Sequence, residues 1–168
     1  KAIKGGGAFL NEVRLQFEPA GDLAKAQVSY DFPILEDTIK HFTAAASATE
    51  HSWDSELTAK GFAVEANWTR QYSWDEFRRL LMQKENDLRL ACYRLRDIGS
   101  ASFSLAWLAQ NLFSAYIVPL QPIEKFVDIA AGILIASESG AKVYRRYLSP
   151  NLYQLIVSSP SVQEDLLK

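Results

Sequence analysis

The 168-residue chain predicts an α+β domain, in which a small antiparallel N-terminal sheet of about three strands packs against a predominantly helical C-terminal part. Three observations support this prediction. Residues 13–32 contain two runs in which apolar and polar side chains alternate. A capping box, Ser73-Trp74-Asp75-Glu76, then opens a charged helical pattern. After this box almost every segment has helical periodicity, so the box separates strands from helices.

The predicted strands alternate with a period of two, which places one face in the core and the other in water. The runs at 13–18 and 24–32 flank a turn at Pro19-Ala20-Gly21-Asp22, so we expect them to form an antiparallel hairpin. A third alternating run at 62–69 completes the sheet, because three strands are far more stable than two.

The predicted helices start at proline and capping positions. Asp31-Phe32-Pro33 is typical of a helix start, and the helix opened by the capping box runs to a C-cap at Gly99. Phe103–Val118 is apolar nearly all round, which is typical of a central helix, and we expect it to cover the apolar face of the sheet. The remaining predicted helices start at Pro122 and span 141–148, 151–158 and 160–168.

Length and composition predict a single domain, residues 1–168, which is either whole or a fragment of a longer chain. Apolar residues make up 48% and charged residues 23%, as in ordinary globular proteins. A net charge of −2 gives no electrostatic reason to expect nucleic acid or an anionic membrane as a partner. We expect no membrane span, because the most apolar stretch is shorter than the roughly 20 residues a bilayer requires.

Cys92 is the only cysteine, which excludes an internal disulfide and fits a reducing compartment. We therefore expect a cytoplasmic location. Cys92 falls on the apolar stripe of its predicted helix, where a cysteine is usually a small buried hydrophobe. The alternative is a nucleophile–base pair of Cys92 with His41, although no local motif indicates a reactive cysteine.

No cofactor is predicted. Gly5-Gly6-Gly7-Ala8 is glycine-rich, but it lacks the Lys-Ser/Thr of a P-loop and precedes a strand instead of following one. One polar segment could hold a divalent metal, and its candidate ligands are Glu50, His51, Asp54 and Glu56. A solvated acidic loop explains the same residues and is the favoured interpretation.

The main candidate for a functional surface interleaves aromatic and arginine side chains. This aromatic–arginine surface comprises Trp68, Arg70, Tyr72, Trp74, Arg78 and Arg79. Such residues dominate the binding energy of protein interfaces, and they also stack on nucleic-acid bases. Core packing with a solvated face is the simpler alternative. A smaller basic–aromatic patch, whose exposed arginines could bind a carboxylate or phosphate, comprises Lys142, Tyr144, Arg145, Arg146 and Tyr147.

These observations favour a non-catalytic interaction or assembly module that docks on a protein partner, or within a larger complex, through the aromatic–arginine surface. An enzyme is not the favoured prediction, because no motif matches a catalytic signature. Two alternatives stay open. One is a nucleic-acid-binding domain that uses the same arginines, which the acidic charge balance disfavours. The other is a small-molecule enzyme with a pocket between sheet and helices.

Overall fold

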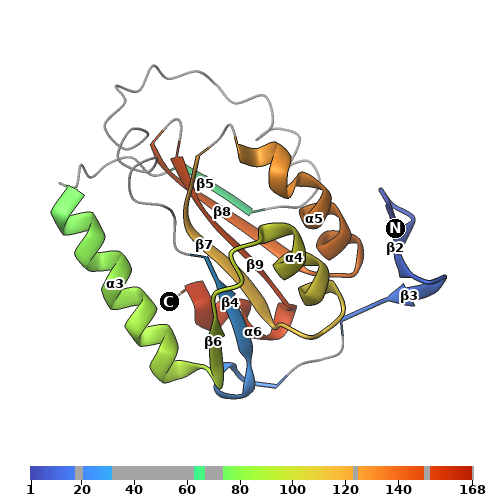
Figure 1. The fold of residues 1–168 in the computed structure, drawn as a ribbon, viewed down its shortest axis with the longest axis horizontal. Helices are drawn as coiled ribbons and strands as arrows, with labels where there is room; N and C mark the ends of the chain where they lie inside the picture. Colours follow the sequence, from blue (N-terminus) through green and yellow to red (C-terminus); the bar gives the residue numbers. More distant parts are fainter. Residues whose placement is uncertain (18–20, 32–62, 67–73, 123–124, 150–151, 168) are drawn as a thin grey trace.

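The computed structural model describes residues 1–17, 21–31, 63–66, 74–122, 125–149 and 152–167. They form two separate sheets with helices packed against them (Figure 1). The main sheet has six strands in the order β5 (Ala63–Ala66), β8 (Lys142–Ser149), β9 (Leu152–Ser158), β7 (Ala115–Pro122), β4 (Gln27–Tyr30) and β6 (Arg94–Arg96). The small sheet has the order β1 (Ala2–Ile3), β2 (Gly7–Leu10) and β3 (Val13–Leu15). The predicted α+β class is confirmed, including a three-stranded antiparallel sheet at the N-terminal end.

The strands of this small sheet differ from the predicted ones. β3 falls within the predicted run 13–18, but it pairs with β2 and not with residues 24–32. The connection is the two-residue turn Asn11-Glu12, in which both residues have positive φ, 47° and 69°. Such a turn matches the right-handed twist of the two strands it joins. The turn therefore closes the hairpin on the N-terminal side of β3, and the predicted hairpin is wrong.

Within the main sheet, β4 is parallel to both β6 and β7, and β5 is parallel to β8. β9 lies between β7 and β8 and is antiparallel to both. The predicted strand at 62–69 therefore exists as β5, but its pairing is parallel and its partner comes from the C-terminal part of the chain.

Three predicted helical segments are wrong. Residues 141–148 and 151–158 form the hairpin β8–β9, and the predicted helix 103–118 is divided into α4 (Ala101–Ala109) and β7. Helix α4 ends where Asn111 takes the left-handed conformation, with φ of 62°. The strands β7 and β9 are covered on both faces, so their sequences are nearly continuously apolar and lack the alternation that indicates a strand. In β8 the apolar residues form two pairs four positions apart, Val143-Tyr144 and Tyr147-Leu148, which resembles helical spacing.

Three other predicted helices are present in the structure. They are α3 (Trp74–Ala91), α5 (Phe126–Glu138) and α6 (Pro160–Leu167), with a short 3₁₀ turn, η1, at Leu23–Lys25. Helix α3 ends before Gly99 because β6 intervenes. The predicted helix start at Asp31-Phe32-Pro33 extends beyond the described residues, as does the capping-box residue Ser73.

Apolar clusters fill both faces of the main sheet. Helices α4 and α5 lie together on one face (Figure 1), where they bury Leu105, Leu108, Ile129 and Ile133 against β7, β8 and β9. Helices α3 and α6 bury Leu88, Val162 and Leu166 against the other face. The side chains of β7 alternate between the two clusters. The sheet is therefore the middle layer of three, and α4 covers one face of it as expected of an apolar helix.

Both arginines of the basic–aromatic patch pack against aromatic rings. Arg145 is only 3% exposed, and its guanidinium carbon lies 4.8 Å from the Phe126 ring centroid and 4.5 Å from that of Tyr153. Arg146 packs over the Tyr144 ring and donates from Nε and Nη2 to the Tyr144 hydroxyl, at 3.2 and 3.0 Å. The prediction of exposed arginines is therefore wrong for Arg145, because a strand in a covered sheet turns alternate side chains inward.

Arg145 should contribute to stability through its contacts with the two rings. We expect Arg145→Ala to lower the free energy of unfolding by about 2 kcal/mol or more, because a desolvated cation–π contact and the packing of the aliphatic stem are both lost. Arg145→Met keeps an apolar side chain of similar length and should lose clearly less. Urea unfolding of both variants tests this; equal losses for alanine and methionine would contradict it.

No helix in the described part of the chain is both long and apolar enough to cross a membrane.

Candidate functional site

The ends of two parallel strands bring a pair of polar segments together at one edge of the main sheet. Ser29 of β4 lies opposite Arg96 of β6 and Tyr116 of β7 in the register. Because β4 and β6 run in the same direction, Asp31 and the turn Asp97–Ser100 follow them at the same edge. The carboxyl ends of parallel strands are where open α/β sheets usually bind ligands.

The turn between β6 and α4 is held by its own side chain and backbone. Asp97 Oδ1 accepts a hydrogen bond from the Gly99 N–H at 3.0 Å, as in an Asx-turn. Gly99 has a φ of 66°, which glycine adopts without strain. Ser100 is the N-cap of α4, and its carbonyl accepts the Ser104 N–H at 3.0 Å. The chain therefore enters α4 in a fixed direction.

Helix α4 is fastened to the sheet directly behind this turn. The hydroxyls of Ser104 in α4 and Ser29 in β4 lie 2.8 Å apart and are fully buried. Ser100, in contrast, makes no side-chain capping bond within the described part of the chain. The first N–H groups of an α-helix have no partner inside the helix, so those of α4 remain available at this end.

The first turn of α5 lies against the first turn of α4. Ser102 Oγ donates to the Asp128 carbonyl oxygen at 3.0 Å. Lys125 is the N-cap of α5, and Asp128 is the acidic residue of its first turn and is exposed. The positively polarised ends of two helices are therefore in hydrogen-bond contact. N–H groups at helix N-termini bind anions, phosphate among them.

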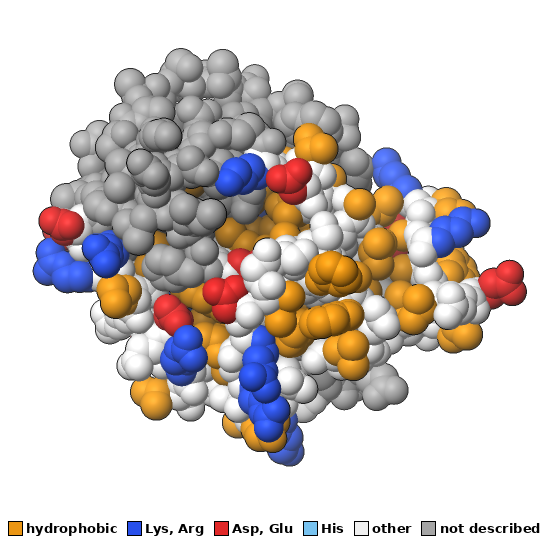
Figure 2. Space-filling view, viewed as in Figure 1, with side chains coloured by type: hydrophobic (Ala, Val, Ile, Leu, Met, Phe, Trp, Pro, Cys, Tyr) orange, Lys and Arg blue, Asp and Glu red, His pale blue; other side chains and the backbone are white. Residues whose placement is uncertain are grey.

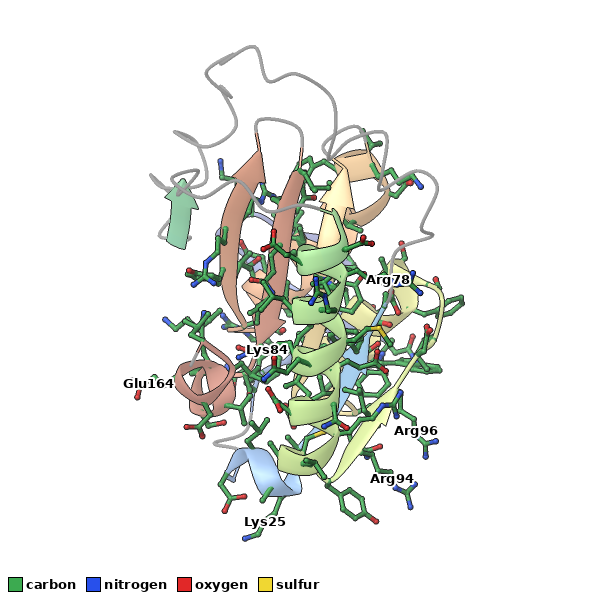
Figure 3. The ribbon with its side chains drawn as sticks, turned by 90° about the vertical axis from the view of Figure 1, so that its left-hand side faces the viewer. Lys25, Arg78, Lys84, Arg94, Arg96 and Glu164 are labelled. Carbon is green, nitrogen blue, oxygen red and sulfur yellow. The ribbon has the colours of Figure 1, made fainter. Side chains whose placement is uncertain are left out.

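Two arginines add positive charge along β6, the strand that leads into the turn. Arg94 and Arg96 are both exposed, and Figure 3 shows that their side chains project from the same side of the strand into solvent. Their spacing of two residues places them on one face. Arg96 directly precedes Asp97, so it places a cation on the strand that leads into this turn.

Asp31 lies beneath the turn in a partly buried position. Burial raises the pKa of its carboxyl above the ordinary 3.8, and the negative charge of Asp97 raises it further. A hydrogen bond with the Tyr116 hydroxyl and the backbone N–H groups of Ile98 and Gly99 lower the pKa. Burial dominates because Oδ1 of Asp31 has no hydrogen bond of ordinary geometry among the described residues. The same site raises the pKa of the Tyr116 hydroxyl, through burial and the Asp31 charge.

The raised pKa of Asp31 predicts how stability depends on pH. The folded protein binds this proton more tightly than the unfolded chain, so the contribution of Asp31 to stability falls as pH rises above 3.8 and through the raised pKa. We expect Asp31→Asn to be more stable than the wild type at neutral pH, and the advantage to shrink as pH falls through the raised pKa and to reach its minimum below 3.8. Urea unfolding at several pH values measures this. An advantage of the variant that is independent of pH would contradict the assignment.

The aromatic–arginine surface is only partly within the described residues. Trp68, Arg70 and Tyr72 lie outside them, and Trp74 is the first residue of α3. Arg78 and Arg79 are exposed on α3, where Figure 3 labels Arg78, and Arg79 Nε donates to the Asp75 carbonyl at 3.1 Å. A binding role of this surface remains an untested prediction.

The other candidate residues have simpler roles or lie outside the described residues. Cys92 is buried, and burial raises the pKa of its thiol, as expected for a small hydrophobe. Its proposed partner His41 and the acidic segment Glu50–Glu56 lie outside the described residues. In the glycine-rich segment, Gly5 and Gly7 donate their N–H groups to the two carboxylate oxygens of Glu138, at 2.7 and 2.9 Å.

Comparison with known proteins identifies the protein family to which this chain belongs. The chain matches the profile of the inositol monophosphatase family over residues 1–166. The chain belongs to the inositol monophosphatase family. A search of curated proteins found no match.

Solved structures of this fold agree with family membership. SuhB of Mycobacterium tuberculosis matches with a TM-score of 0.55 and 20% identity, over 92% of this chain and 44% of SuhB. Staphylococcal inositol monophosphatase-1, in an inhibitory complex soaked in LiCl, matches with a TM-score of 0.59 and 19% identity, over 99% and 47% of the two chains. An IMPase/NADP phosphatase complexed with Mg²⁺ and phosphate gives the same scores and coverage. At sequence identities of 19–20%, the structural likeness shows only that the fold is shared. The chain spans about half the length of these relatives.

Family membership corrects the functional prediction. The prediction of a non-catalytic interaction or assembly module, with an enzyme as the less favoured reading, is wrong, because the family is one of phosphatases. The alternative of a small-molecule enzyme agrees with the comparisons. The prediction is wrong for a physical reason: the sequence contains no recognisable catalytic signature, and backbone N–H groups at helix ends leave few marks in a sequence.

One local pattern could have indicated the site. Asp97-Ile98-Gly99-Ser100 combines an Asx-turn residue, a glycine at a positive-φ position and an N-cap residue directly before the apolar helix at Ala101. The helical periodicity before Gly99 instead favours its interpretation as the C-cap of the preceding helix. The contact between Ser102 and Asp128 has no counterpart in the sequence pattern, because 26 residues separate them.

Proposed function

We propose that this chain supplies part of the active site of a phosphatase that hydrolyses a phosphate monoester of a small molecule, such as inositol monophosphate. Membership of the inositol monophosphatase family supports the reaction class. The observation that carries the proposal is the contact between the N-terminal turns of α4 and α5, through Ser102 and Asp128, next to the carboxyl ends of β4 and β6.

The backbone of this chain would bind the phosphate group. The first N–H groups of α4 and α5 donate hydrogen bonds to phosphate oxygens, and the two helix dipoles favour the negative charge. Gly99 brings the backbone close to the ligand because it has no side chain, and a Cβ at this position would meet open space. Arg96 and Lys125 add positive charge. Ser100, whose hydroxyl makes no capping bond to its own helix, is free to contact the substrate.

Asp128 adds an exposed carboxylate to this site. A carboxylate beside a bound phosphate weakens anion binding unless a cation lies between them. One solved relative, the IMPase/NADP phosphatase, is a complex with both Mg²⁺ and phosphate. Among the described residues, however, no three His, Cys, Asp or Glu side chains come together in a way that could hold a metal. The described residues therefore do not form a metal site by themselves, and only phosphate recognition is derived from them.

Phosphate binding can be measured directly on this chain. Inorganic phosphate is titrated into ¹⁵N-labelled protein, and we expect the amide signals of Ser100, Ala101 and Ser102 to shift saturably while those of α6 stay unchanged. In parallel, phosphate release from inositol monophosphate and NADP is measured with Mg²⁺, with and without LiCl. Shifts at α4 without turnover support phosphate recognition by this part of the enzyme. The absence of both shifts and turnover would overturn the proposal.

We also propose a cytoplasmic location. The single cysteine and its burial in the apolar core support a chain that functions without disulfides. Fractionation of the source cells with an antibody against the chain tests this, and recovery in the secreted fraction would contradict it.

A further inference from the structure

Arg145 is a buried cation inside the main sheet. Its strand β8 is paired on both sides, and in the register Arg145 lies opposite Val64 of β5 and Leu155 of β9. The backbone at Arg145 is therefore fixed by its neighbours. A guanidinium that is removed from water costs free energy unless its surroundings compensate for the loss. The contacts of Arg145 therefore indicate what stabilises it in this position.

The guanidinium of Arg145 lies against the residue that begins helix α5. Phe126 is the first residue of α5, and its ring centroid is 4.8 Å from the guanidinium carbon. Tyr153 of β9, which is fully buried, provides a second ring at 4.5 Å. The faces of aromatic rings attract a cation, and the attraction is stronger away from water. Arg145 thus connects the start of α5 to the strands β8 and β9.

The first turn of α5 extends this connection to α4. Two residues after Phe126, the Asp128 carbonyl oxygen accepts the hydrogen bond from Ser102 Oγ in the first turn of α4. A continuous set of contacts therefore runs from Arg145 in the sheet, through the first turn of α5, to the first turn of α4. A shift of Phe126 would move the backbone N–H groups that are proposed to bind phosphate.

The charge of Arg145 lies near the positively polarised end of α5. A cation at a helix N-terminus is unfavourable, whereas an anion there is favourable. Lys125, the N-cap residue, places a second cation at the same end. Figure 2 shows hydrophobic side chains gathered over the region of α4 and α5, and buried charges are screened much less than exposed ones. The charge of Arg145 therefore adds to the attraction for an anion at this helix end.

We propose that Arg145 is a positioning residue of the phosphate site. Its contact with Phe126 sets the direction of the first turn of α5, and its charge favours an anion at that helix end. It acts through the helix and not by touching the ligand, because its side chain is buried beneath the site. This inference rests on the proposed function, in which phosphate binds at the starts of α4 and α5.

The test is the titration of inorganic phosphate into ¹⁵N-labelled wild type and variants of Arg145. Arg145→Met keeps the packing of the stem and loses the charge, so we expect phosphate affinity to fall about fivefold or more while most of the stability is kept. Arg145→Gln is a second neutral variant with the same expectation. Arg145→Lys keeps a cation at this position, and we expect it to bind phosphate at least about twice as tightly as Arg145→Met.

The matched control is Arg146→Met. Arg146 is the next residue of β8, and it packs over the ring of Tyr144, which belongs to the apolar cluster on the opposite face of the sheet. Neighbouring side chains of a strand point to opposite faces, so this variant loses a similar cation–ring contact without affecting the start of α5. We expect its phosphate affinity to stay within about twofold of the wild type.

The results separate this inference from the proposed function. If the wild type shows no saturable shift with phosphate, the proposed function fails and this inference fails with it. If the wild type binds phosphate and the neutral variants of Arg145 bind it equally well, Arg145 only packs in the core, and this inference alone is overturned. It is also overturned if Arg145→Lys binds no better than Arg145→Met, or if Arg146→Met loses as much affinity. Urea unfolding of each variant shows that it is folded in the titration.

Discussion

Replacing Gly132 with valine should lower the free energy of unfolding by about 3 kcal/mol or more, because it overpacks the contact between α4 and α5. Gly132 faces α4, and a Cβ at this position would lie 2.7 Å from Leu105 Cδ1 and 2.9 Å from Leu105 Cβ. Both distances are shorter than real carbon contacts. Leu105 is fully buried, so its side chain has no space into which it can move. The helices would have to separate, and the first turns of α4 and α5 would move with them.

A second substitution tests whether Leu105 is the cause. Leu105→Ala alone should cost about 2–5 kcal/mol, because it leaves a cavity. Combined with Gly132→Val, it removes the atoms that clash, and the valine fills part of the cavity. We therefore expect the double variant to lose clearly less than the sum of the two single losses. Ala131→Val is the control, since Ala131 is exposed on the same helix. Urea unfolding measures all four proteins, and additive losses would contradict the explanation.

Gly99→Val should reduce phosphate affinity at least tenfold. Gly99 has a φ of 66°, and a β-branched residue held there costs about 1–3 kcal/mol. The turn can relieve this strain by returning to negative φ, which redirects the backbone N–H groups at the start of α4. The amide titration described above measures the loss, and kcat/KM for phosphate release should fall in parallel wherever turnover is observed.

The matched variant for this position is Gly99→Asn. Asparagine tolerates the left-handed region, and its Cβ would meet no atom within 4 Å. We expect this variant to keep most of the phosphate affinity. If asparagine and valine weaken binding equally, the backbone conformation at Gly99 is not the reason for binding.

Local sequence patterns predict a substantial part of the fold correctly. Helices α3 and α5 are predicted from their apolar stripes of helical period, and α6 is predicted from its start at Pro160. The predicted start of α5 at Pro122 is wrong, because Pro122 is the last residue of β7 and the N-cap of α5 is Lys125. The burial of Cys92 follows from its place on such a stripe. β5 is predicted from its alternation, although its partner is not.

Other features could not be read from local patterns. β9 is covered by helices on both faces, so its apolar residues run together and do not alternate. In β8 the apolar residues form two pairs four positions apart, which resembles the spacing of a helix. The sequence predicts that the Arg145 side chain is exposed to solvent. In the structure, strand β8 places its guanidinium against the Phe126 and Tyr153 rings. The predicted aromatic–arginine surface rests on composition alone, and half of its residues lie outside the described part of the chain.

The sequence by itself determined the α+β class, the presence of helices α3, α5 and α6, and the starts of α3 and α6, because these depend on residues that are neighbours along the chain. Tertiary structure decided which strands pair, which face of each helix is covered, and that the first turns of α4 and α5 meet through Ser102 and Asp128. These features depend on contacts between residues far apart in sequence, and the free energy of such contacts is set by packing and not by local preference.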